Sequence, residues 1–492
     1  MSKLSGVYRR QRRSGGTPAG DEEGRRCGRG SLPGDGLPQE GEGAGPSAAA
    51  TTCRISSSSS SSDAAAPRLV EFSASLHGGS LHDFRATDVD GGRREHRDCR
   101  AGIAGLATAL GLHRQGIRSV VLESSPTLRA AGFAFTTWTN AWRALDALGV
   151  GDTIRAHHLR GQRLVVKSAS SGETTTKLSL MAQGRSGMHE IYCVKRNFLL
   201  ETLEKELPRG TIRYSSKIVS IEEDGNIKLL HLADGSIIRT KVLIGCDGVN
   251  SIVAKWLGLK KPSFSGRSAT RGLAEFPNGH GFQPEFLQFS GEGFRAGLLT
   301  CSEQSLYWFF TWTPSLTEVE ENTSKMREYI LKKLKLAKVP DEVIQVIEVS
   351  EMSDVVSSPL RYRSPVSLLC GKITKENVCV AGDAFHPMTP DLGQGGCSAL
   401  EDSIVLARCL GEAIRGEDKG GKKGEYERIK DGLKKYAENR RWRGIQLIVT
   451  AYIIGFIQQS DNAFIGFLRG KILSGIMAKT LMKMADYDCG KL

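Results

Sequence analysis

The sequence predicts an α/β protein with a doubly wound, Rossmann-like parallel sheet and a second domain built on an antiparallel sheet. The first observation is a set of short apolar runs that have strand length and lack polar alternation, as is typical of buried parallel strands. These runs are Ser119–Leu122, Lys241–Gly245 and Val378–Ala381. The last two runs lead into dipeptides of aspartate and glycine, Asp247-Gly248 and Gly382-Asp383.

The second observation is a group of segments with alternating or aromatic residues, which predict antiparallel strands. They are Phe286–Phe289, Gly297–Thr300 and Leu306–Trp312. Helical periodicity in Lys325–Lys335 and Glu342–Glu348 predicts two helices beside them. We therefore expect a separate sheet domain with its own helices.

The earliest αβ unit starts at Gly102. Ile103, Leu106 and Leu110 repeat at helical spacing, and Gly116 is placed to end the helix before the first apolar run. A dinucleotide site needs glycines where the backbone approaches a pyrophosphate and a carboxylate about 20 residues later for ribose hydroxyls. Gly102, Gly105 and Glu123 fit this pattern; a helix start that tolerates glycine, with an exposed Glu123, is the structural alternative.

The other two motifs are Gly245–Ser251 and Gly382–Gly396. A carboxylate at a strand end, followed by a glycine-rich helix start, offers an acceptor for sugar hydroxyls and free N–H groups for an anionic ring edge. Each dipeptide alone is a common turn, so a purely structural role is the alternative for each.

These motifs together resemble the class A flavoprotein monooxygenases, the family of para-hydroxybenzoate hydroxylase and salicylate hydroxylase. The similarity is greatest to the plant branch related to zeaxanthin epoxidase. It is carried by AGIAGLATALGLHRQGIRSVVLES, NAWRALDALGV, GCDGVNS and VAGDAFHPMTPDLGQGGCSALEDS. It extends over about Gly102 to Arg443 and implies an FAD-binding domain with the substrate pocket under the antiparallel sheet.

The resemblance also implies the cofactor-binding residues. Gly102 and Gly105 would approach the pyrophosphate, Glu123 the adenosine ribose and Asp383 the ribityl chain, and the turn Gly393–Gly396 would face the flavin ring. The full set is Gly102, Gly105, Glu123, Arg129, Arg196, Asp247, Gly248, Gly382, Asp383, Pro390, Gly393, Gln394, Gly395 and Gly396. Arg129 and Arg196 would flank the cofactor, and surface salt bridges are the alternative for both.

The implied activity is a monooxygenation that consumes NAD(P)H and O2 and hydroxylates or epoxidises a small or medium-sized apolar substrate. Its cofactors would be FAD and NAD(P)H, since the chemistry belongs mainly to the cofactor. No catalytic acid or base is assigned, and His386 is interpreted as a turn residue. The aromatic residues Phe286, Phe289, Phe294, Trp308, Phe310 and Trp312 either line the pocket or pack the sheet.

Composition and charge exclude several other classes. The chain has 492 residues, 39% hydrophobic and 25% charged, which is enough for a large core and rules out a fibre. The net charge of +13 raises the question of nucleic acid. However, the basic residues of 415–443 alternate with acids, which predicts a solvated helix and no nucleic-acid partner. The eleven cysteines contain no CxxC pair, so neither a disulfide framework nor a metal site is expected.

Residues 1–99 differ in composition from the rest of the chain, because Gly, Ser and Pro supply 36 of the 99 positions. We expect a disordered or non-native segment there. Early acidic residues weaken a transit-peptide interpretation, and the location is left open between cytoplasm and chloroplast. The segment Arg94–Arg100 is charged where the family has its first apolar strand, so the sequence predicts that this strand is missing.

That gap leaves two rivals to the monooxygenase: a flavin oxidoreductase that does not oxygenate, and an inactive interaction protein on a flavoprotein scaffold. Two smaller departures from the family are Cys397, where many relatives carry Asn, and Ala254, where they carry Arg.

The predicted domains are discontinuous. Residues 100–164, 190–262 and 365–443 form the FAD-binding domain, 165–189 and 263–364 the substrate domain, and 444–492 a C-terminal helical region. A long helix is expected over Tyr426–Ile457. Its apolar part, 445–457, is too short to span a bilayer, so core packing is the first interpretation and peripheral membrane contact the second. The oligomeric state is not predicted.

Overall fold

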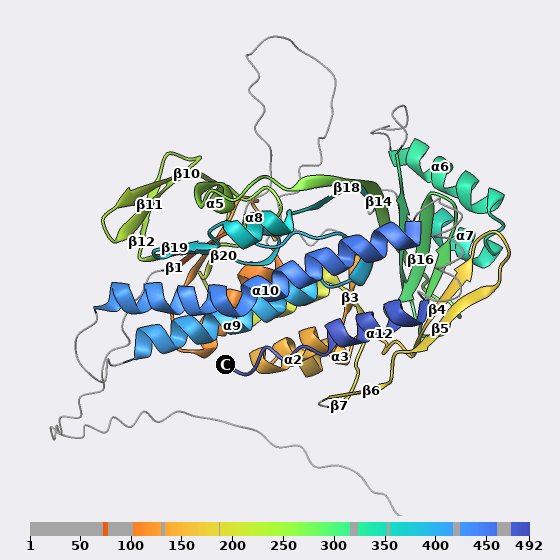
Figure 1. Ribbon diagram of the computed structural model, residues 1–492, viewed down its shortest axis with the longest axis horizontal. Coiled ribbons are helices and arrows are strands. Elements are labelled where there is room, and N and C mark those ends of the chain that lie inside the picture. Colours follow the sequence, from red (N-terminus) through yellow and green to blue (C-terminus); the bar gives the residue numbers. More distant parts are fainter. Residues whose placement is uncertain are drawn as a thin grey trace, which may run out of the picture. The chain divides into compact units, whose positions relative to one another are not determined.

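A computed structural model describes residues 72–76, 102–128, 133–185, 187–314, 323–351, 355–416, 424–459 and 474–492 (Figure 1). All of these belong to one compact unit, Ala66–Leu492. Arg129 and the segment 94–100 lie outside the described residues. The predicted boundaries between the FAD-binding and substrate domains remain a prediction.

The first layer of this unit is a mainly parallel, six-stranded sheet in the order β19-β20-β13-β1-β2-β9. Its strands are β1 (Phe72–Leu76), β2 (Val120–Glu123), β9 (Ile212–Arg213), β13 (Val242–Gly245), β19 (Thr374–Lys375) and β20 (Val378–Val380). The pairings β1–β2, β1–β13, β13–β20 and β2–β9 are parallel, and only β19 is antiparallel to its neighbour. The three apolar runs are therefore confirmed as β2, β13 and β20.

The central strand corrects the expectation that the sheet lacks its first strand. β1 pairs on one side with β13, where Ala74 is opposite Ile244, and on the other with β2, where Ala74 is opposite Val121. The strand thus comes from residues more than 20 positions before the glycine motif, a region that the composition assigned to disorder. Both neighbouring strands gain backbone partners that a gap would have left without hydrogen bonds.

Helices α1 (Ile103–Arg114), α9 (Gly395–Arg415) and α10 (Glu425–Gln459) form a packed layer, with α9 between the other two (Figure 1). The contact of α1 with α9 is close because small residues meet there: a Cβ on Gly111 would lie 2.8 Å from the Cβ of Ala407. The predicted helices at Gly102 and over Tyr426–Ile457 are confirmed as α1 and α10.

The second layer is a seven-stranded sheet in the order β18-β14-β17-β16-β15-β4-β5. Its strands are β4 (Arg163–Ser168), β5 (Thr174–Ser179), β14 (Ser263–Glu275), β15 (Glu285–Ser290), β16 (Phe294–Thr300), β17 (Ser305–Trp312) and β18 (Val356–Tyr362). Helices α6 (Thr323–Leu336) and α7 (Asp341–Glu348) pack on one face of it. The predicted antiparallel strands and both helices are confirmed, although β4 pairs with β15 in parallel.

Side-chain alternation divides the aromatic residues of this sheet between its two faces. Phe289, Phe294, Trp308, Phe310 and Trp312 are buried in the core with α6 and α7. Their packing interpretation is therefore supported, and the opposite face of the sheet is left to other residues.

The remaining elements connect or cover the two sheets. They are β3 (Ala134–Thr137), α2 (Thr139–Leu148), α3 (Gly151–Arg155), β6 (Gln183–Gly184), β7 (Gly187–Met188), β8 (Tyr192–Lys195), α4 (Arg196–Lys205), β10 (Ile218–Asp224), β11 (Ile227–Leu232), β12 (Ile237–Thr240), α5 (Ile252–Trp256), α8 (Pro365–Cys370), η2 (Gly382–Ala384), η3 (Pro390–Leu392) and α12 (Ser474–Ala485).

The C-terminal part of α10 has one buried face and one exposed face. Leu447, Ile448 and Ala451 are buried, whereas Ile453 and Phe456 are half or more exposed. Core packing of 445–457 is supported for the buried face, and membrane contact through the other face stays a prediction. Among the helices described, none is long and apolar enough to cross a bilayer.

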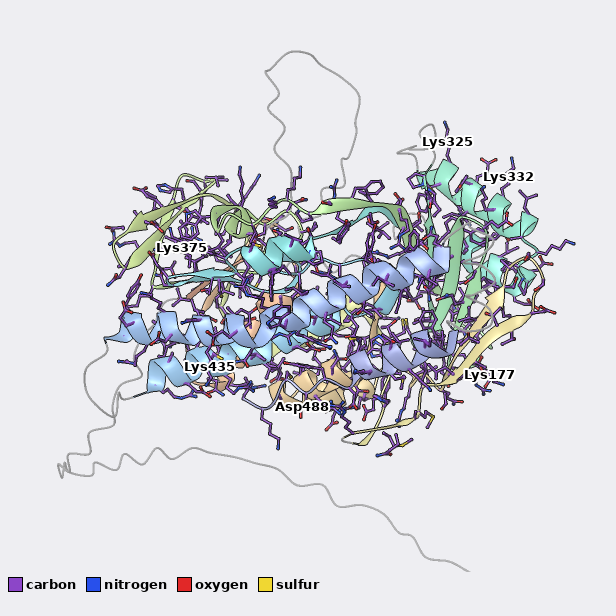
Figure 2. All side chains as sticks on the ribbon, in the orientation of Figure 1. Lys177, Lys325, Lys332, Lys375, Lys435 and Asp488 are labelled. Carbon is purple, nitrogen blue, oxygen red and sulfur yellow. The ribbon has the colours of Figure 1, made fainter. Side chains whose placement is uncertain are left out.

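The charge pattern of α10 differs from a fully solvated helix. Arg440 and Arg443 are buried at 0% and 7% exposure, so this part of the expectation is wrong. Other basic residues do lie at the surface on separate elements, among them Lys177, Lys332 and Lys435 (Figure 2). Within the described ranges, no group of His, Cys, Asp and Glu could hold a metal ion, and the eight described cysteines are free.

Candidate active site

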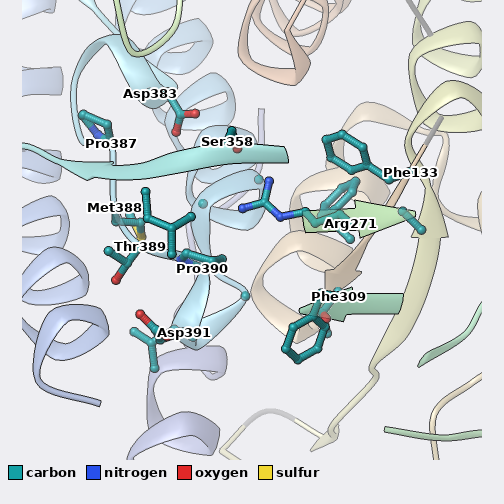
Figure 3. A pocket seen from close by; sticks show the side chains of 18 of the residues that line it. Phe133, Arg271, Phe309, Ser358, Asp383, Pro387, Met388, Thr389, Pro390 and Asp391 are labelled. Carbon is teal, nitrogen blue, oxygen red and sulfur yellow. The ribbon is translucent and has the colours of Figure 1, made fainter. Parts of the chain in front are cut away.

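A cavity of about 690 Å³ lies against both sheets and the start of α9 (Figure 3). One part is lined by predicted cofactor residues, and the other by residues of the antiparallel sheet. The predicted residues that line it are Gly102, Arg196, Gly248, Asp383, Pro390, Gly393, Gly395 and Gly396. Motifs separated by almost 300 residues in the sequence therefore meet in one space.

Two helix N-termini open on this cavity. Gly102 precedes α1 and Gln394 precedes α9, and neither helix start receives a hydrogen bond from a capping side chain. Gly395 is the first residue of α9, and a Cβ placed on it would meet nothing within 4 Å. The unpaired N–H groups and the positive end of the helix dipole make these positions suited to anionic groups.

The other glycines of the third motif are required by their surroundings. Gly382 and Gly393 have φ angles of 60° and 62°, in the left-handed region that favours glycine. A Cβ on Gly396 would come within 2.8 Å of the Phe135 ring. The motif therefore fixes a tight backbone path along the cavity wall.

Glu123 ends β2 and is fully buried. Its Oε1 accepts hydrogen bonds from the backbone N–H of Ser125, at 2.7 Å, and from the hydroxyl of Ser124, at 3.3 Å. The alternative of a solvent-facing Glu123 is therefore wrong. Gly105 is also buried, inside α1, where its N–H donates to the carbonyl of Gly102. Neither residue lines the cavity.

Asp247 is almost completely buried and does not line the cavity. Its carboxylate accepts hydrogen bonds from the hydroxyl of Ser251 at 2.5 Å and from the N–H of Ile252 at 2.7 Å, so it caps α5. Burial raises the pKa of Asp247 to about 6, although these hydrogen bonds oppose the shift. Its neighbour Gly248, with φ of 77°, reaches the cavity instead.

Asp383 is exposed and lines the cavity, as expected for a residue that binds a ligand's hydroxyl groups. Figure 3 shows it well separated from Asp391, the other carboxylate of the wall. Arg196 begins α4 and is buried at 7% exposure against the same space. Arg129, the other predicted arginine, lies outside the described residues.

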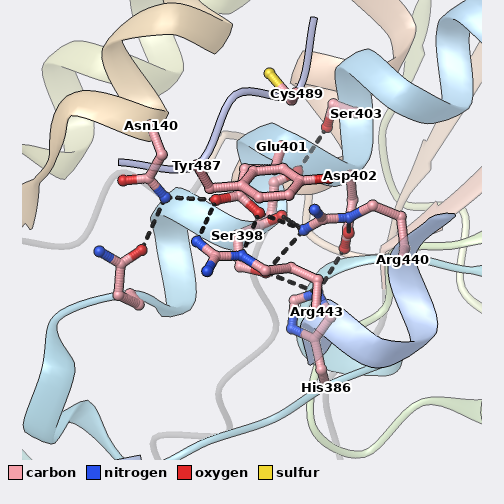
Figure 4. A network of polar contacts seen from close by, with 12 residues as sticks. Asn140, His386, Ser398, Glu401, Asp402, Ser403, Arg440, Arg443, Tyr487 and Cys489 are labelled. Carbon is pink, nitrogen blue, oxygen red and sulfur yellow. Dashed lines mark hydrogen bonds and ion pairs between the residues drawn. The ribbon is translucent and has the colours of Figure 1, made fainter. Parts of the chain in front are cut away.

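A buried polar network joins the first turns of α9 to α2 and α10 (Figure 4). Glu401 accepts hydrogen bonds or ion pairs from Arg440 at 2.6 Å, Arg443 at 2.8 Å and Asn140 at 2.5 Å. Asn140 also donates to Gln394 at 2.8 Å, which holds the residue before the helix. Gln394 is thus a buried supporting residue and does not line the cavity.

His386 belongs to the same network and is fully buried. Its Nε2 lies 2.6 Å from Oδ2 of Asp402 and 3.2 Å from the hydroxyl of Ser398. Because it is enclosed and does not line the cavity, the structure supports the structural interpretation of His386.

A second cluster links η3 to strands β14 and β16 of the antiparallel sheet. Asp391 pairs through both oxygens with Arg267, at 2.8 and 2.9 Å, and accepts from Arg295 at 3.0 Å. All three side chains are at least nine-tenths buried. Two arginines thus share one carboxylate beside the cavity, which leaves one positive charge in excess within the cluster.

Sequence reasoning missed most of the residues that the antiparallel sheet contributes. Phe286 was a candidate and does line the cavity, but Arg271, Gln288, Tyr307 and Phe309 were not singled out. Strand alternation could have indicated Tyr307 and Phe309, because they alternate along β17 with the core residues Trp308 and Phe310.

Comparison with known proteins adds to this geometry. Residues 101–441 match the family described as FAD binding domain. The chain is 52% identical to Monooxygenase 2 of Arabidopsis thaliana over 397 residues, which cover 80% of this chain and 96% of that protein. It is 36% identical to Monooxygenase 1 of the same plant over 403 residues, covering 80% and 97%.

Among solved structures, the chain resembles Klebsiella pneumoniae HpxO complexed with FAD and uric acid, with a TM-score of 0.68 at 22% identity. The match covers 85% of this chain and 96% of that chain. At this identity the likeness concerns the fold.

Proposed function

The chain belongs to the FAD-binding family of class A flavoprotein monooxygenases, and from this premise we propose that it uses NAD(P)H and O2 to hydroxylate or epoxidise a small or medium-sized apolar substrate. One observation carries the proposal: a single cavity joins the glycine-rich turn at Gly393–Gly396 to the aromatic face of the antiparallel sheet. A cofactor held by the turn and a substrate held by the sheet would therefore share one cavity.

The residues present fit FAD. The open space at Gly395 leaves room for a group to approach the start of α9, and Gly102 offers a second helix N-terminus to phosphate. Asp383 presents an exposed carboxylate to the same space, where it would bind ribityl hydroxyls. When bound, FAD supplies the chemistry that passes electrons from NAD(P)H to dioxygen and one oxygen atom to the substrate.

The chain's own residues would chiefly position and enclose the reactants. Phe286, Leu299 and Phe309 provide apolar walls that exclude water from the substrate side. Burial raises the pKa of Tyr307 to about 12, so this hydroxyl stays protonated and can donate a hydrogen bond at neutral pH. The N-terminus of α9 would stabilise negative charge that develops nearby.

Of the two rivals, the inactive scaffold depended on the missing first strand, and β1 removes that support. The flavin oxidoreductase that does not oxygenate is distinguished by experiment. The FAD-loaded chain should incorporate one labelled atom from ¹⁸O₂ into a turned-over substrate while one NADH or NADPH is consumed. Product that forms without the label would overturn oxygenation for this chain.

The same assay tests how NAD(P)H is used. The three motifs account for FAD, and no separate nicotinamide fingerprint follows them in the sequence. We therefore expect transient docking, with slow NAD(P)H oxidation and hydrogen peroxide release when no substrate is present. Tight stoichiometric binding of NAD(P)H in a titration would contradict this expectation.

A further inference from the structure

Five large apolar side chains on helices α8 and α10 face solvent, and each is half or more exposed. They are Val366, Leu369, Trp442, Ile453 and Phe456. Single exposed apolar residues are common on protein surfaces and need no explanation. A contiguous group of them marks a surface that binds a partner, so the relative positions of these five residues decide their meaning.

The three residues of α10 lie on one face of that helix. Ile453 and Phe456 follow Trp442 by 11 and 14 residues, which is about three and four helical turns. Arg441 is the residue before Trp442, and Tyr452 is the residue before Ile453, so both lie along the same edge of this face.

Helix α8 lies directly beside that edge of α10 (Figure 1). The guanidinium of Arg441 donates to the carbonyls of Leu368 and Gly371, at the C-terminal end of α8. Further along α10, the ring centroid of Tyr452 lies 4.9 Å from that of Tyr362, the last residue of β18. The apolar side chains of the two helices therefore belong to one surface.

Two lysines of the loop after α5 border this surface. The backbone N–H of Lys260 donates to the hydroxyl of Ser367 on α8, at 3.3 Å, and Lys261 follows it. Both lysines are exposed, and neither forms an ion pair within the described ranges. Their charges are therefore available to an anionic partner. These two lysines and the five apolar residues are called the α8 surface below.

The three segments that build the α8 surface contain no acidic residue. They are 248–274, 355–375 and 439–459, and together they hold 12 Lys and Arg. The whole chain, by contrast, has 54 acidic residues to 67 basic ones. Some of the 12 cations are buried, but no carboxylate on these segments offsets the exposed lysines. The first acid before Trp442 on α10 is Glu438, one turn earlier, where the apolar face ends.

We propose that the α8 surface binds the headgroup region of a membrane that contains anionic lipids. Exposed aromatic and aliphatic side chains enter the interface between water and acyl chains, and lysines beside them attract anionic headgroups. The contact is peripheral, because none of the described helices could cross a bilayer. A second copy of the chain fits less well, because a symmetric contact would bring the lysines of both copies together without carboxylates from these segments.

The test measures by flotation how the FAD-loaded full chain binds vesicles. One set of vesicles is pure phosphatidylcholine, and the other is equal parts of phosphatidylcholine and phosphatidylglycerol. We expect binding to the anionic vesicles to be at least about ten-fold tighter at low ionic strength, and the difference to shrink with added salt. Lys260→Gln combined with Lys261→Gln should weaken binding to the anionic vesicles by about ten-fold. Trp442→Gln should weaken it by at least about five-fold, because the indole ring would no longer enter the interface.

The matched controls lie on α6, which Figure 1 shows well separated from α8. Lys332 and Lys333 are adjacent exposed lysines, and Leu336 is an exposed apolar residue of the same helix. Lys332→Gln combined with Lys333→Gln removes the same charge, and Leu336→Gln removes exposed apolar surface. Both proteins should bind the anionic vesicles within about two-fold of the natural chain. Flavin content and thermal unfolding of each variant show that the fold is retained.

Tryptophan fluorescence tests whether this surface is the part that enters the bilayer. Lipids with brominated acyl chains quench a tryptophan that reaches the acyl region. Quenching should be strong in the natural chain and largely lost in Trp442→Phe, which keeps an aromatic ring and should keep its binding to the anionic vesicles.

Three results would overturn the proposal: equal binding to both kinds of vesicle or binding to neither, losses in the α6 controls as large as those in the α8 surface variants, or unchanged quenching in Trp442→Phe. A dimer in sedimentation that Trp442→Gln dissociates, without vesicle binding, would assign the surface to a second copy instead. None of these outcomes bears on the ¹⁸O₂ assay, so the membrane contact and the proposed monooxygenation are tested separately.

Discussion

The Nε2 of His386 lies 2.6 Å from Oδ2 of Asp402, and both side chains are fully buried. The same oxygen accepts the backbone N–H of Gly382, and Oδ1 of Asp402 accepts Nε of Arg440 at 2.7 Å. One carboxylate thus joins the end of the parallel sheet, helix α9 and helix α10. Burial opposes ionisation of Asp402, but its contacts with His386, Arg440 and the N–H of Gly382 outweigh burial and lower its pKa, so the group is an anion at neutral pH.

Asp402→Ala should therefore lower the free energy of unfolding by about 3–5 kcal/mol, because it leaves His386 and the Nε of Arg440 buried without this acceptor, although Arg440 keeps its pair with Glu401. The matched control is Glu412→Ala, which breaks a surface ion pair between the same two helices, with Lys435 at 2.6 Å. That change should cost less than about 1 kcal/mol. Urea unfolding of both variants measures the difference, and similar losses would contradict the role assigned to Asp402.

The raised pKa of Asp247, about 6, predicts a dependence of stability on pH. The folded state holds this proton more tightly than the unfolded chain, whose aspartate pKa is about 3.9, so stability falls as pH rises from about 4 to about 6. Asp247→Asn should therefore gain stability relative to the natural chain across this interval, by up to about 3 kcal/mol. The free energy of unfolding is measured from pH 4 to 7 for the natural chain, for Asp247→Asn and for the exposed control Asp152→Asn. The same pH dependence in the natural chain and in Asp247→Asn would refute the raised pKa of Asp247.

The sequence predicted the elements whose pattern is local. β2, β13 and β20 are continuous apolar runs, and α10 is a long stretch without proline, so each was visible without its neighbours. β1 was not, because Phe-Ser-Ala-Ser-Leu has no continuous apolar run and is separated from the glycine motif that normally follows the first strand. Its place depends on pairing with strands far away in the sequence.

The residues of the candidate site likewise fall into those that a local motif predicts and those that it does not. Glycines and Asp383 belong to motifs whose spacing reveals them, whereas Arg271 and Gln288 lie on strands where only the sheet face decides what they contact. The buried network was hidden for another reason. Arg440 alternates with acids along α10, and only packing against α9 reveals that its partners are Glu401 and Asp402.

Asp383→Ala should weaken FAD binding by about 1–3 kcal/mol, since ribityl hydroxyls would lose a charged acceptor. Flavin fluorescence during dialysis against dilute FAD measures the affinity. Asp383→Asn keeps an acceptor oxygen, so its FAD affinity should lie between those of the natural chain and Asp383→Ala. An Asp383→Ala protein with unchanged affinity would remove Asp383 from the cofactor site.

Two alanine substitutions in the third motif separate binding from folding. Gly395→Ala should fold normally, because its Cβ meets nothing within 4 Å, but should reduce FAD affinity by filling the space at the start of α9. Gly393→Ala should destabilise the protein by about 1 kcal/mol or more, because φ is 62° and the Cβ would lie 3.0 Å from Nε1 of Trp138. Thermal unfolding and flavin content are measured for both, and full FAD affinity in Gly395→Ala would place the cofactor elsewhere.

The last prediction tests which segment supplies the central strand. In a parallel sheet each inner strand hydrogen-bonds on both sides, and proline removes the donor, so proline is confined to edges. Ala74 lies in the middle of β1 with Ile244 on one side and Val121 on the other. Ala74→Pro should therefore abolish bound FAD and most of the soluble yield.

Arg97→Pro is the matched comparison, because it places the same residue in the charged segment directly before the glycine motif, where related proteins have their first strand. If β1 is the central strand, Arg97→Pro should keep the flavin content of the natural chain. The reverse pattern, in which Arg97→Pro lacks bound FAD and Ala74→Pro retains it, would show that the central strand comes from residues 94–99. The contrast is decisive because loss of ladder hydrogen bonds at the centre of the sheet, at several kcal/mol, is comparable with the whole stability of a domain.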